Sequence, residues 1–272
     1  MRRPSPVLVA AGGVTTIVVA ALVTGGVLVA RIADPPSPTT TVTADDGSEV
    51  VLDWADYPAE AWVEPEDVLA APRAEDVEET TAAQLAALEA AIDQAAPGMT
   101  WATDPADEER QQLFPVGGNG YGGQSLHAVW NGRTQLGSGL AEDADWHAMA
   151  AALDAQVADL GYDPITWSHE RAPYPGESVA ERDAEILAAH GSLDPDEMWS
   201  WSGSARDGSM WLDVQVWDAR RATAPADPWQ STTAGIAIML GGTVVSADDE
   251  QAYVDGIAPF EGLSRPEPTH SD

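Results

Sequence analysis

Two tryptophans are the side chains in this sequence best suited to contact a ligand. Trp211 and Trp217 lie on one face of a predicted strand, because side chains in a strand alternate between its two faces. A hairpin about Asp207-Gly208 adds Ser200 and Ser202 to that face. Exposed aromatic rings beside hydroxyls are typical of surfaces that bind sugars or proteins. We therefore expect Trp211 and Trp217 to bind a ligand, and the alternative is that helices cover this face.

Acidic clusters are the next candidates, because calcium prefers six to eight oxygen ligands from closely spaced carboxylates. No cluster has the spacing of an EF-hand loop, and a chain with 45 acids forms clusters by chance. We therefore expect a solvated acidic surface and no metal site. The three clusters are Asp104/Asp107/Glu108/Glu109, Asp194/Asp196/Glu197 and Asp248/Asp249/Glu250/Asp255.

The other motifs do not predict catalysis. Residues Gly118 to Gly123 match the dinucleotide pattern G-x-G-x-x-G, but a predicted strand over 125–130 follows where a phosphate-binding helix is required. Gly137-Ser138-Gly139 is too short for a nucleophile elbow, and the five histidines have no H-E-x-x-H spacing. We predict no catalytic residue and no cofactor. A carboxylate pair of the kind that hydrolyses glycosides remains an alternative, since a sequence does not show distances.

The composition excludes several classes of protein. The chain has 272 residues, 45 Asp and Glu, 12 Arg, no Lys and no Cys, with a formal charge of −33. Nucleic-acid binding requires basic residues to neutralise phosphates, so it is excluded. The absence of Cys excludes a disulfide scaffold, Cys-ligated zinc and a cysteine nucleophile.

The N-terminus predicts a membrane anchor. Residues 7–30 carry no charge, and as a helix they would extend about 36 Å, enough to cross a hydrocarbon core of about 30 Å. Arg2 and Arg3 precede the run, so the positive-inside rule keeps residues 1–6 in the cytoplasm and places the rest of the chain outside. A cleaved signal peptide is the alternative, although its apolar region is usually only about 7–15 residues.

The remainder of the chain divides into a linker and extended segment over 31–74, an ordered domain over 75–258 and a flexible tail over 259–272. Within the first of these, residues 51–74 contain Trp54, Tyr57 and Trp62, so they form either a short docked segment or more linker. Within the domain, apolar periodicity predicts helices over 75–96, 145–160 and 178–190.

Two dipeptides predict β-hairpins in this domain. Asn131-Gly132 is expected to join strands over 125–130 and 133–137. Asp207-Gly208 is expected to pair Ala205 with Met210 and Trp201 with Val214. Shorter strands are expected over 99–103 and 165–169, and a last one over 233–240. The fold class is therefore α+β, a two-layer sandwich of an antiparallel sheet with two or three helices, plus one N-terminal transmembrane helix.

The junction Pro97-Gly98-Met99-Thr100-Trp101 after the first predicted helix resembles that of the LppA-like lipoproteins of mycobacteria and related actinobacteria. The helix ending in Leu160-Gly161-Tyr162 and the Asp207-Gly208 hairpin follow in the same order. The resemblance implies an envelope protein without an assigned reaction. Those proteins are usually anchored through a lipidated Cys, which this chain lacks, so a transmembrane helix would replace the lipid.

We therefore expect a single-pass, N-in protein of the cell membrane, with an acidic extracytoplasmic domain that binds an envelope protein, polymer or cation without catalysis. Two alternatives remain. One is an envelope hydrolase with a carboxylate pair, which a Trp-lined cleft between two carboxylates would favour. The other is a secreted binding protein, released if residues 7–30 are cleaved.

Overall fold

The computed structural model describes residues 35–44, 46–222 and 233–269. These residues form two compact units, which are described separately. The aromatic unit comprises the described residues up to Trp62, residues 117–125 and those from Asp255 onward. The sheet unit comprises residues 63–116 and the described residues of 126–254. The structure thus confirms a mixed α+β fold with an antiparallel sheet.

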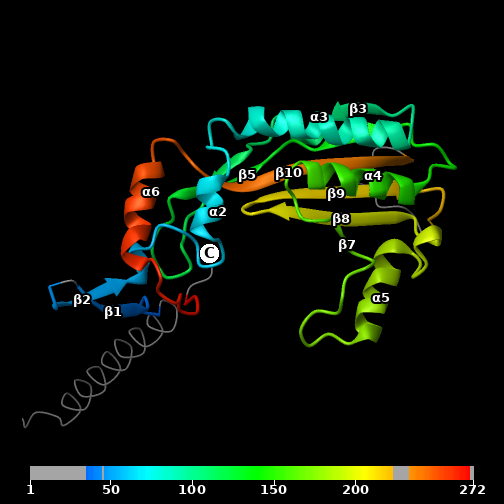
Figure 1. The fold of residues 1–272 in the computed structure, drawn as a ribbon. Helices are drawn as coiled ribbons and strands as arrows, with labels where there is room; N and C mark the ends of the chain where they lie inside the picture. Colours follow the sequence, from blue (N-terminus) through cyan, green and yellow to red (C-terminus); the bar gives the residue numbers. More distant parts are fainter. Residues whose placement is uncertain (1–34, 45, 223–232, 270–272) are drawn as a thin grey trace, which may run out of the picture. The chain divides into compact units, whose positions relative to one another are not determined.

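The sheet unit is built on eight antiparallel strands (Figure 1). Six of them follow the order β3-β6-β10-β9-β8-β7, while β5 pairs with β10 and β4 pairs with β5. The strands are β3 (Thr100–Thr103), β4 (Leu113–Pro115), β5 (His127–Asn131), β6 (Gln135–Ser138), β7 (Thr166–Trp167), β8 (Ser200–Asp207), β9 (Met210–Asp218) and β10 (Ala234–Val245).

The hairpin predicted at Asn131-Gly132 is wrong. Both β5 and β6 pair with β10, at Gly241–Val245 and Gly235–Ile238 respectively, and not with each other. The Gly132 N–H donates to the carbonyl of Leu240 at 2.9 Å, so the chain continues along β10 instead of reversing. A type I′ turn requires positive φ at both central residues, and neither Asn131 nor Gly132 has it. The 12-residue β10 is long enough to pair with both strands.

The second hairpin is present, but its register differs from the prediction by two residues. Asp207 pairs with Met210, so Gly208 and Ser209 form the turn, and Ala205 pairs with Leu212. Gly208 has φ +54°, as expected for the first central residue of a type II′ turn. The Ser209 hydroxyl donates to the Thr243 carbonyl at 2.8 Å, which holds Ser209 in the turn. A shift of two residues leaves every side chain on its predicted face.

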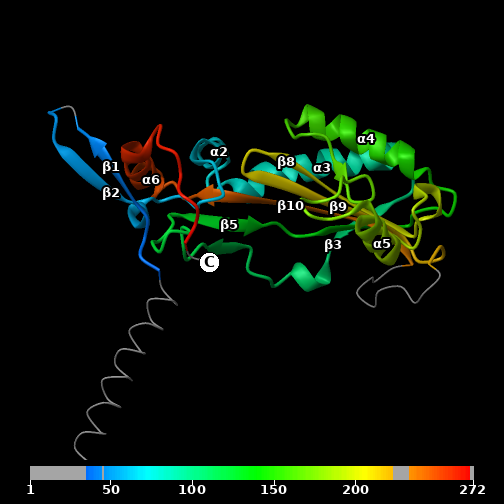
Figure 2. The same cartoon turned by 90° about the horizontal axis from the view of Figure 1, so that it is seen from below.

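One side of this sheet, which we call the helix face, forms the core of the unit. Helices α3 (Val77–Ala95) and α4 (Trp146–Asp159) pack together on that side (Figures 1 and 2). Both lie within one or two residues of their predicted bounds. Apolar residues from both layers are buried there, including Leu88, Ile92, Met149, Leu153, Leu212, Val214, Val216, Ile236, Ile238 and Leu240.

Local capping explains where the helices begin and end. The Asp145 carboxylate accepts a hydrogen bond from the Ala148 N–H at 2.9 Å, which places α4 one residue later. The third predicted helix is α5 (Val179–His190), which has a capping box at Ser178 and ends at Gly191 in the left-handed region. Two helices were not predicted, α2 (Pro65–Ala70) and α6 (Glu250–Ile257).

The aromatic unit replaces part of the predicted linker. Strands β1 (Thr39–Thr43) and β2 (Glu49–Asp53) form an antiparallel hairpin, where an extended segment was expected. The core of the unit is a cluster of four aromatic rings with centroids 4.8–6.3 Å apart. These rings are Trp54, Tyr57, Tyr121 and Phe260. A docked segment over 51–74 was one of the two alternatives, but its partners were not predicted because they come from distant parts of the sequence.

The C-terminal segment also differs from the predicted flexible tail. Phe260 is buried in the aromatic cluster, and the Thr269 N–H donates to the Gly120 carbonyl at 3.0 Å. Among the residues that the structure describes, no helix is long and apolar enough to cross a membrane. The predicted transmembrane helix over 7–30 lies outside the described residues.

Candidate functional site

The face of the sheet opposite the helix face carries a row of hydroxyls, and we call it the serine face. In β8 the residues Ser200, Ser202 and Ser204 alternate with the buried Trp201 and Ala205. The β7 residue Thr166 pairs with Ser204. The Ser168 N–H donates to the Ser202 carbonyl at 2.8 Å, which extends the pairing by one residue. Because directly paired residues share a face, the hydroxyls of β7 and β8 lie side by side.

The predicted ligand-binding tryptophans lie on the serine face but not together. Trp217 pairs with Ser200, and its side chain is only 4% exposed, so its ring offers little surface to a ligand. Trp211 pairs with Arg206 near the opposite end of β9 and is half-buried. A Cβ on Gly241 would collide with the Trp211 ring, so this ring lies against the backbone of β10. Ligand binding by Trp211 and Trp217 stays a prediction.

A polar cavity of about 340 Å³ opens on the serine face. Hydroxyls make up much of its wall, with one aromatic ring, two carboxylates and one guanidinium. The sequence placed Ser202 on this face, but it did not indicate Ser168 or the loop and helix that complete the wall. The lining residues are Thr166, Ser168, Arg171, Tyr174, Glu185, Ser202, Gly203, Ser204 and Asp213. We call this cavity the serine pocket.

A loop before α5 holds the basic side of the pocket in place. The Arg171 guanidinium pairs with Glu177 at 2.6 and 2.9 Å and with Glu185 at 2.5 Å. It also lies 4.2 Å from the centroid of the Tyr174 ring, a cation–π contact. Hydrogen bonds from Arg171, and then from the Tyr174 N–H, lower the pKa of Glu177 to about 2. The loop therefore keeps its charge-assisted hydrogen bonds down to acidic pH.

Asp213 supplies a carboxylate from β9 on the same face. Burial raises the pKa of Asp213, and the positive charge of Arg206 opposes that effect. A carboxylate with few competing partners is free to accept hydrogen bonds from a ligand.

A chain of hydrogen bonds runs from the pocket into the protein. The Ser168 hydroxyl lies 2.8 Å from the Ser202 hydroxyl and 2.9 Å from His190 Nε2. His190 is the last residue of α5, and its Nδ1 lies 3.2 Å from the Ser200 hydroxyl. His190 and Ser200 are buried, at 5% and 3% exposure. The sequence offered no sign of this chain, because Ser168 and His190 are 22 residues apart and meet only in the fold.

Two histidines contact the Trp201 ring at the same end of the sheet, and His190 lies beside one of them. The rings of His147 and His169 lie 5.0 and 4.8 Å from the Trp201 ring, and His169 lies 6.4 Å from His190. Burial, and then the nearby charges of His190 and His147, lower the pKa of His169 to about 4. His169 is therefore neutral near pH 7, as a side chain among aromatic rings requires.

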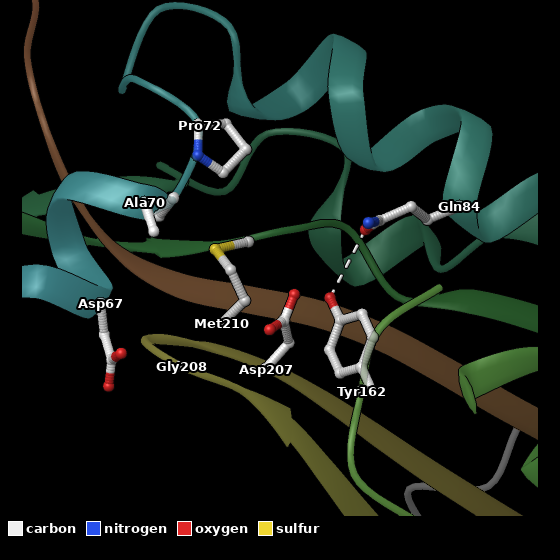
Figure 3. Close-up of a pocket in the computed structure, with 9 residues that line it drawn as sticks. Asp67, Ala70, Pro72, Gln84, Tyr162, Asp207, Gly208 and Met210 are labelled. Atoms are coloured by element: carbon white, nitrogen blue, oxygen red, sulfur yellow. Dashed lines mark hydrogen bonds between the residues drawn. The ribbon is translucent and has the colours of Figure 1, made fainter. Parts of the chain in front are cut away.

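A second, smaller cavity of about 160 Å³ lies beside the β8–β9 turn (Figure 3). Asp207 and Tyr162 line it, and the Tyr162 hydroxyl donates to Gln84 Oε1 at 3.4 Å. Burial and the charge of Asp207 raise the pKa of Tyr162 to about 12. Burial and the charges of Asp67 and Asp163 raise the pKa of Asp207. Asp67 also lines the cavity, but no Trp does, so it differs from the cleft expected for a carboxylate-pair hydrolase.

The glycine-rich segment has a structural role. Asn119 is fully buried, and its side-chain amide donates to the carbonyls of Trp54 and Tyr57 at 2.9 and 2.7 Å. Its side-chain oxygen accepts from the N–H groups of Tyr121 and Gly123, both at 2.9 Å. The element that follows residues 118–123 is the strand β5, not a helix, so the dinucleotide pattern lacks the helix N-terminus that would bind a phosphate.

Each predicted acidic cluster has at least one member that is paired with another part of the chain. Asp107 accepts from the Thr134 N–H at 2.9 Å, and Asp196 lies 3.0 Å from His147. Glu250 forms two hydrogen bonds with Arg73, at 2.6 and 2.9 Å. Within the described ranges, no three His, Asp or Glu side chains are grouped so that they could hold a metal ion.

Comparisons with known proteins add little to this geometry. No family model and no curated protein matches the sequence. One solved structure, the crystal structure of "the putative lipoprotein LppA from Mycobacterium tuberculosis", aligns with 76% of this chain and 91% of its own, at 8% identity and a TM-score of 0.39. At that TM-score the similarity carries no argument about function, so the site is interpreted from this chain alone.

Proposed function

We propose that this chain is a single-pass envelope protein whose acidic extracytoplasmic domain binds a hydroxyl-rich ligand, such as an envelope glycan, in the serine pocket. The observation that carries the proposal is the lining of that pocket. Four of its residues, Thr166, Ser168, Ser202 and Ser204, bear hydroxyls that both donate and accept hydrogen bonds.

The other walls suit a sugar. The Asp213 and Glu185 carboxylates accept hydrogen bonds from ligand hydroxyls. Tyr174 is 62% exposed, and Arg171 stacks on it, so its ring is held at the pocket for contact with the apolar face of a sugar. The volume of about 340 Å³ lies in the range of small-molecule sites.

The anchor and the acidity support the proposed location. Residues 1–33 carry three Arg and no acid, whereas all 45 acids follow. This distribution agrees with a cytoplasmic N-terminus and an exported, highly acidic domain.

Binding is tested by calorimetric titration of the full chain in detergent with neutral oligosaccharides, including tri-N-acetylchitotriose. We expect saturable binding, weakened about 10-fold in Tyr174→Ala, which is roughly 1.4 kcal/mol. Trp62→Ala is the matched control, because Trp62 is 61% exposed and does not line the pocket. Absence of saturable binding to every oligosaccharide, or equal affinity in Tyr174→Ala and the wild type, would contradict the proposal.

The anchor is tested by mass spectrometry of the mature N-terminus. An intact Met1 or Arg2 is expected for a retained membrane helix. A mature terminus near residue 31 or 34 would instead show cleavage and a secreted protein.

A further inference from the structure

The strongest unassigned feature of the molecule is the hydrogen-bonded series Ser202, Ser168, His190 and Ser200. A serine within hydrogen-bond reach of a histidine is the arrangement that activates a hydroxyl as a nucleophile. The Ser168 and His190 atoms are 2.9 Å apart, inside the required range of about 2.6–3.2 Å. Ser168 also lines the serine pocket, so its hydroxyl is open to a bound molecule.

The environment of His190 favours the proton arrangement that a general base needs. Burial lowers the pKa of His190, so the neutral ring, with one donor and one acceptor nitrogen, is favoured near pH 7. A hydrogen bond to the Ser200 backbone acts in the opposite direction and raises the pKa, as a carbonyl that accepts from the ring does. Nδ1 is the ring nitrogen beside Ser200, at 3.2 Å from its hydroxyl. With the proton on Nδ1, Nε2 is the acceptor that faces Ser168.

This arrangement leaves Ser202 as a donor. When Ser168 donates its hydrogen to His190, the 2.8 Å contact between the two serine hydroxyls requires Ser202 to donate to Ser168. The three hydrogen bonds then run in one direction, from Ser202 to Ser168, from Ser168 to His190 and from His190 to Ser200. Ser200 and the C-terminal end of α5 fix the ring in place.

We propose that Ser168 is an acyl-accepting nucleophile and His190 its general base, so that the serine pocket cleaves a carboxylic ester carried by the hydroxyl-rich ligand. This inference rests on the proposed function for the identity of the ligand and on the Ser168–His190 geometry for the chemistry. It departs from the expectation of a domain without catalysis.

In the first half of the reaction, the Ser168 oxygen attacks the ester carbonyl carbon, and its proton passes to His190 Nε2. The tetrahedral intermediate collapses with cleavage of the ester C–O bond, and the leaving alkoxide takes the proton from Nε2. The products at this stage are the free alcohol and an acylated Ser168.

In the second half, water attacks the acyl group and gives a proton to Nε2. Collapse of the second intermediate releases a carboxylic acid and returns the proton to Ser168. The net reaction consumes one ester and one water and yields one acid and one alcohol. The other hydroxyls that line the pocket and the Arg171 guanidinium are the donors available to stabilise the oxyanion.

The charges of the pocket narrow the substrate class. Among the described residues that line it, Arg171 is the single cation, and it is paired with Glu177 and Glu185. Asp213 adds a further negative charge. This balance disfavours phosphate and sulfate esters, and it favours an uncharged carboxylic ester such as an O-acyl sugar.

The first experiment treats the purified full chain with a fluorophosphonate probe, which reacts with activated serines, and locates the adduct by peptide mass spectrometry. We expect the adduct on Ser168 and its loss in His190→Gln. Ser48→Ala is the matched control, because Ser48 is an exposed serine between β1 and β2 that does not line the pocket, and this variant should label like the wild type.

The second experiment measures hydrolysis of p-nitrophenyl acetate. Removal of the nucleophile in Ser168→Ala, a change small enough to preserve the fold, should lower the rate by about 10²-fold or more. The rate of the wild type should rise with pH through a midpoint below 6.5, as His190 loses its proton. Failure of the probe to modify Ser168, or an equal rate in Ser168→Ala, would overturn the inference.

The two proposals fail separately. Oligosaccharide binding retained by Ser168→Ala, with no adduct in the wild type, would keep the binding function and remove the esterase. An adduct on Ser168 with no binding to any oligosaccharide would support Ser168 as a nucleophile and contradict a glycan as the ligand.

Discussion

The two faces of the same sheet are used in opposite ways. On the helix face, β8, β9 and β10 present apolar side chains to α3 and α4, and residues such as Leu212 and Ile238 are fully buried. On the serine face, β8 presents hydroxyls and β9 presents the Asp213 carboxylate, and α5 reaches the hydroxyls through His190. The alternation of side chains along each strand determines which face a residue lies on. The helix or loop that packs on that face then determines whether the residue is buried in the core or open to a ligand.

The largest expected effect concerns the helix face. Leu212→Ala removes a fully buried side chain and should lower the free energy of unfolding by about 2–5 kcal/mol, through lost transfer energy and a cavity. Gln215→Ala, on the exposed side of the same strand, should change it by no more than about 0.5 kcal/mol. Urea unfolding measures both. Equal losses in the two variants would mean that the faces do not differ in burial as described.

A smaller effect is expected where the serine face is itself packed. Gly241→Ala places a methyl group against the Trp211 ring, and overpacking of this kind costs about 1–3 kcal/mol. In a Trp211→Ala background the clash disappears, so a double-mutant cycle by urea unfolding should show coupling between the two positions. Purely additive effects would show that the Trp211 ring does not lie on Gly241.

A third effect depends on pH and concerns His169 and His190, whose pKa values are lowered by burial. The pKa of His169 is about 4 in the folded protein and about 6.5 when exposed. Between these values the unfolded chain binds a proton that the native state does not, so the free energy of unfolding falls as the pH falls from about 6.5 to about 4. Below about pH 4 this contribution no longer changes. His190, whose pKa burial also lowers, adds to the trend.

The test compares urea midpoints at pH 7 and pH 4.5. His169→Gln should reduce the difference between the two midpoints, because it removes the titrating ring. Gln215→Ala is the control, since Gln215 is exposed and does not titrate, and this variant should retain the wild-type difference. A steeper pH dependence in His169→Gln would contradict the shift assigned to His169.

Much of the sheet unit could be predicted from local patterns. The bounds of α3, α4 and α5 follow from apolar periodicity, from Asp145 as an N-cap and from Gly191 at a C-terminus. The side of each residue in β8 and β9 follows from alternation, and it survived a register error of two residues. These features depend on neighbours within a few positions, which a sequence displays directly.

Pairing between distant segments could not be predicted in the same way. Asn131-Gly132 has the composition of a tight turn, yet β10 pairs with both flanking strands and keeps the chain extended. The aromatic unit combines residues near 54, 121 and 260, so no local window contains its core.

The sequence by itself determined the helices α3, α4 and α5, the two faces of β8 and β9, and the separation of positive and negative charge along the chain. Only the tertiary structure decided that Trp217 is buried, that Trp211 lies on Gly241, and that His190 meets Ser168. The physical reason is the distance along the sequence over which each effect acts. Strand alternation and helix capping depend on residues a few positions apart, whereas burial and hydrogen bonding at the site depend on which distant element packs on the sheet.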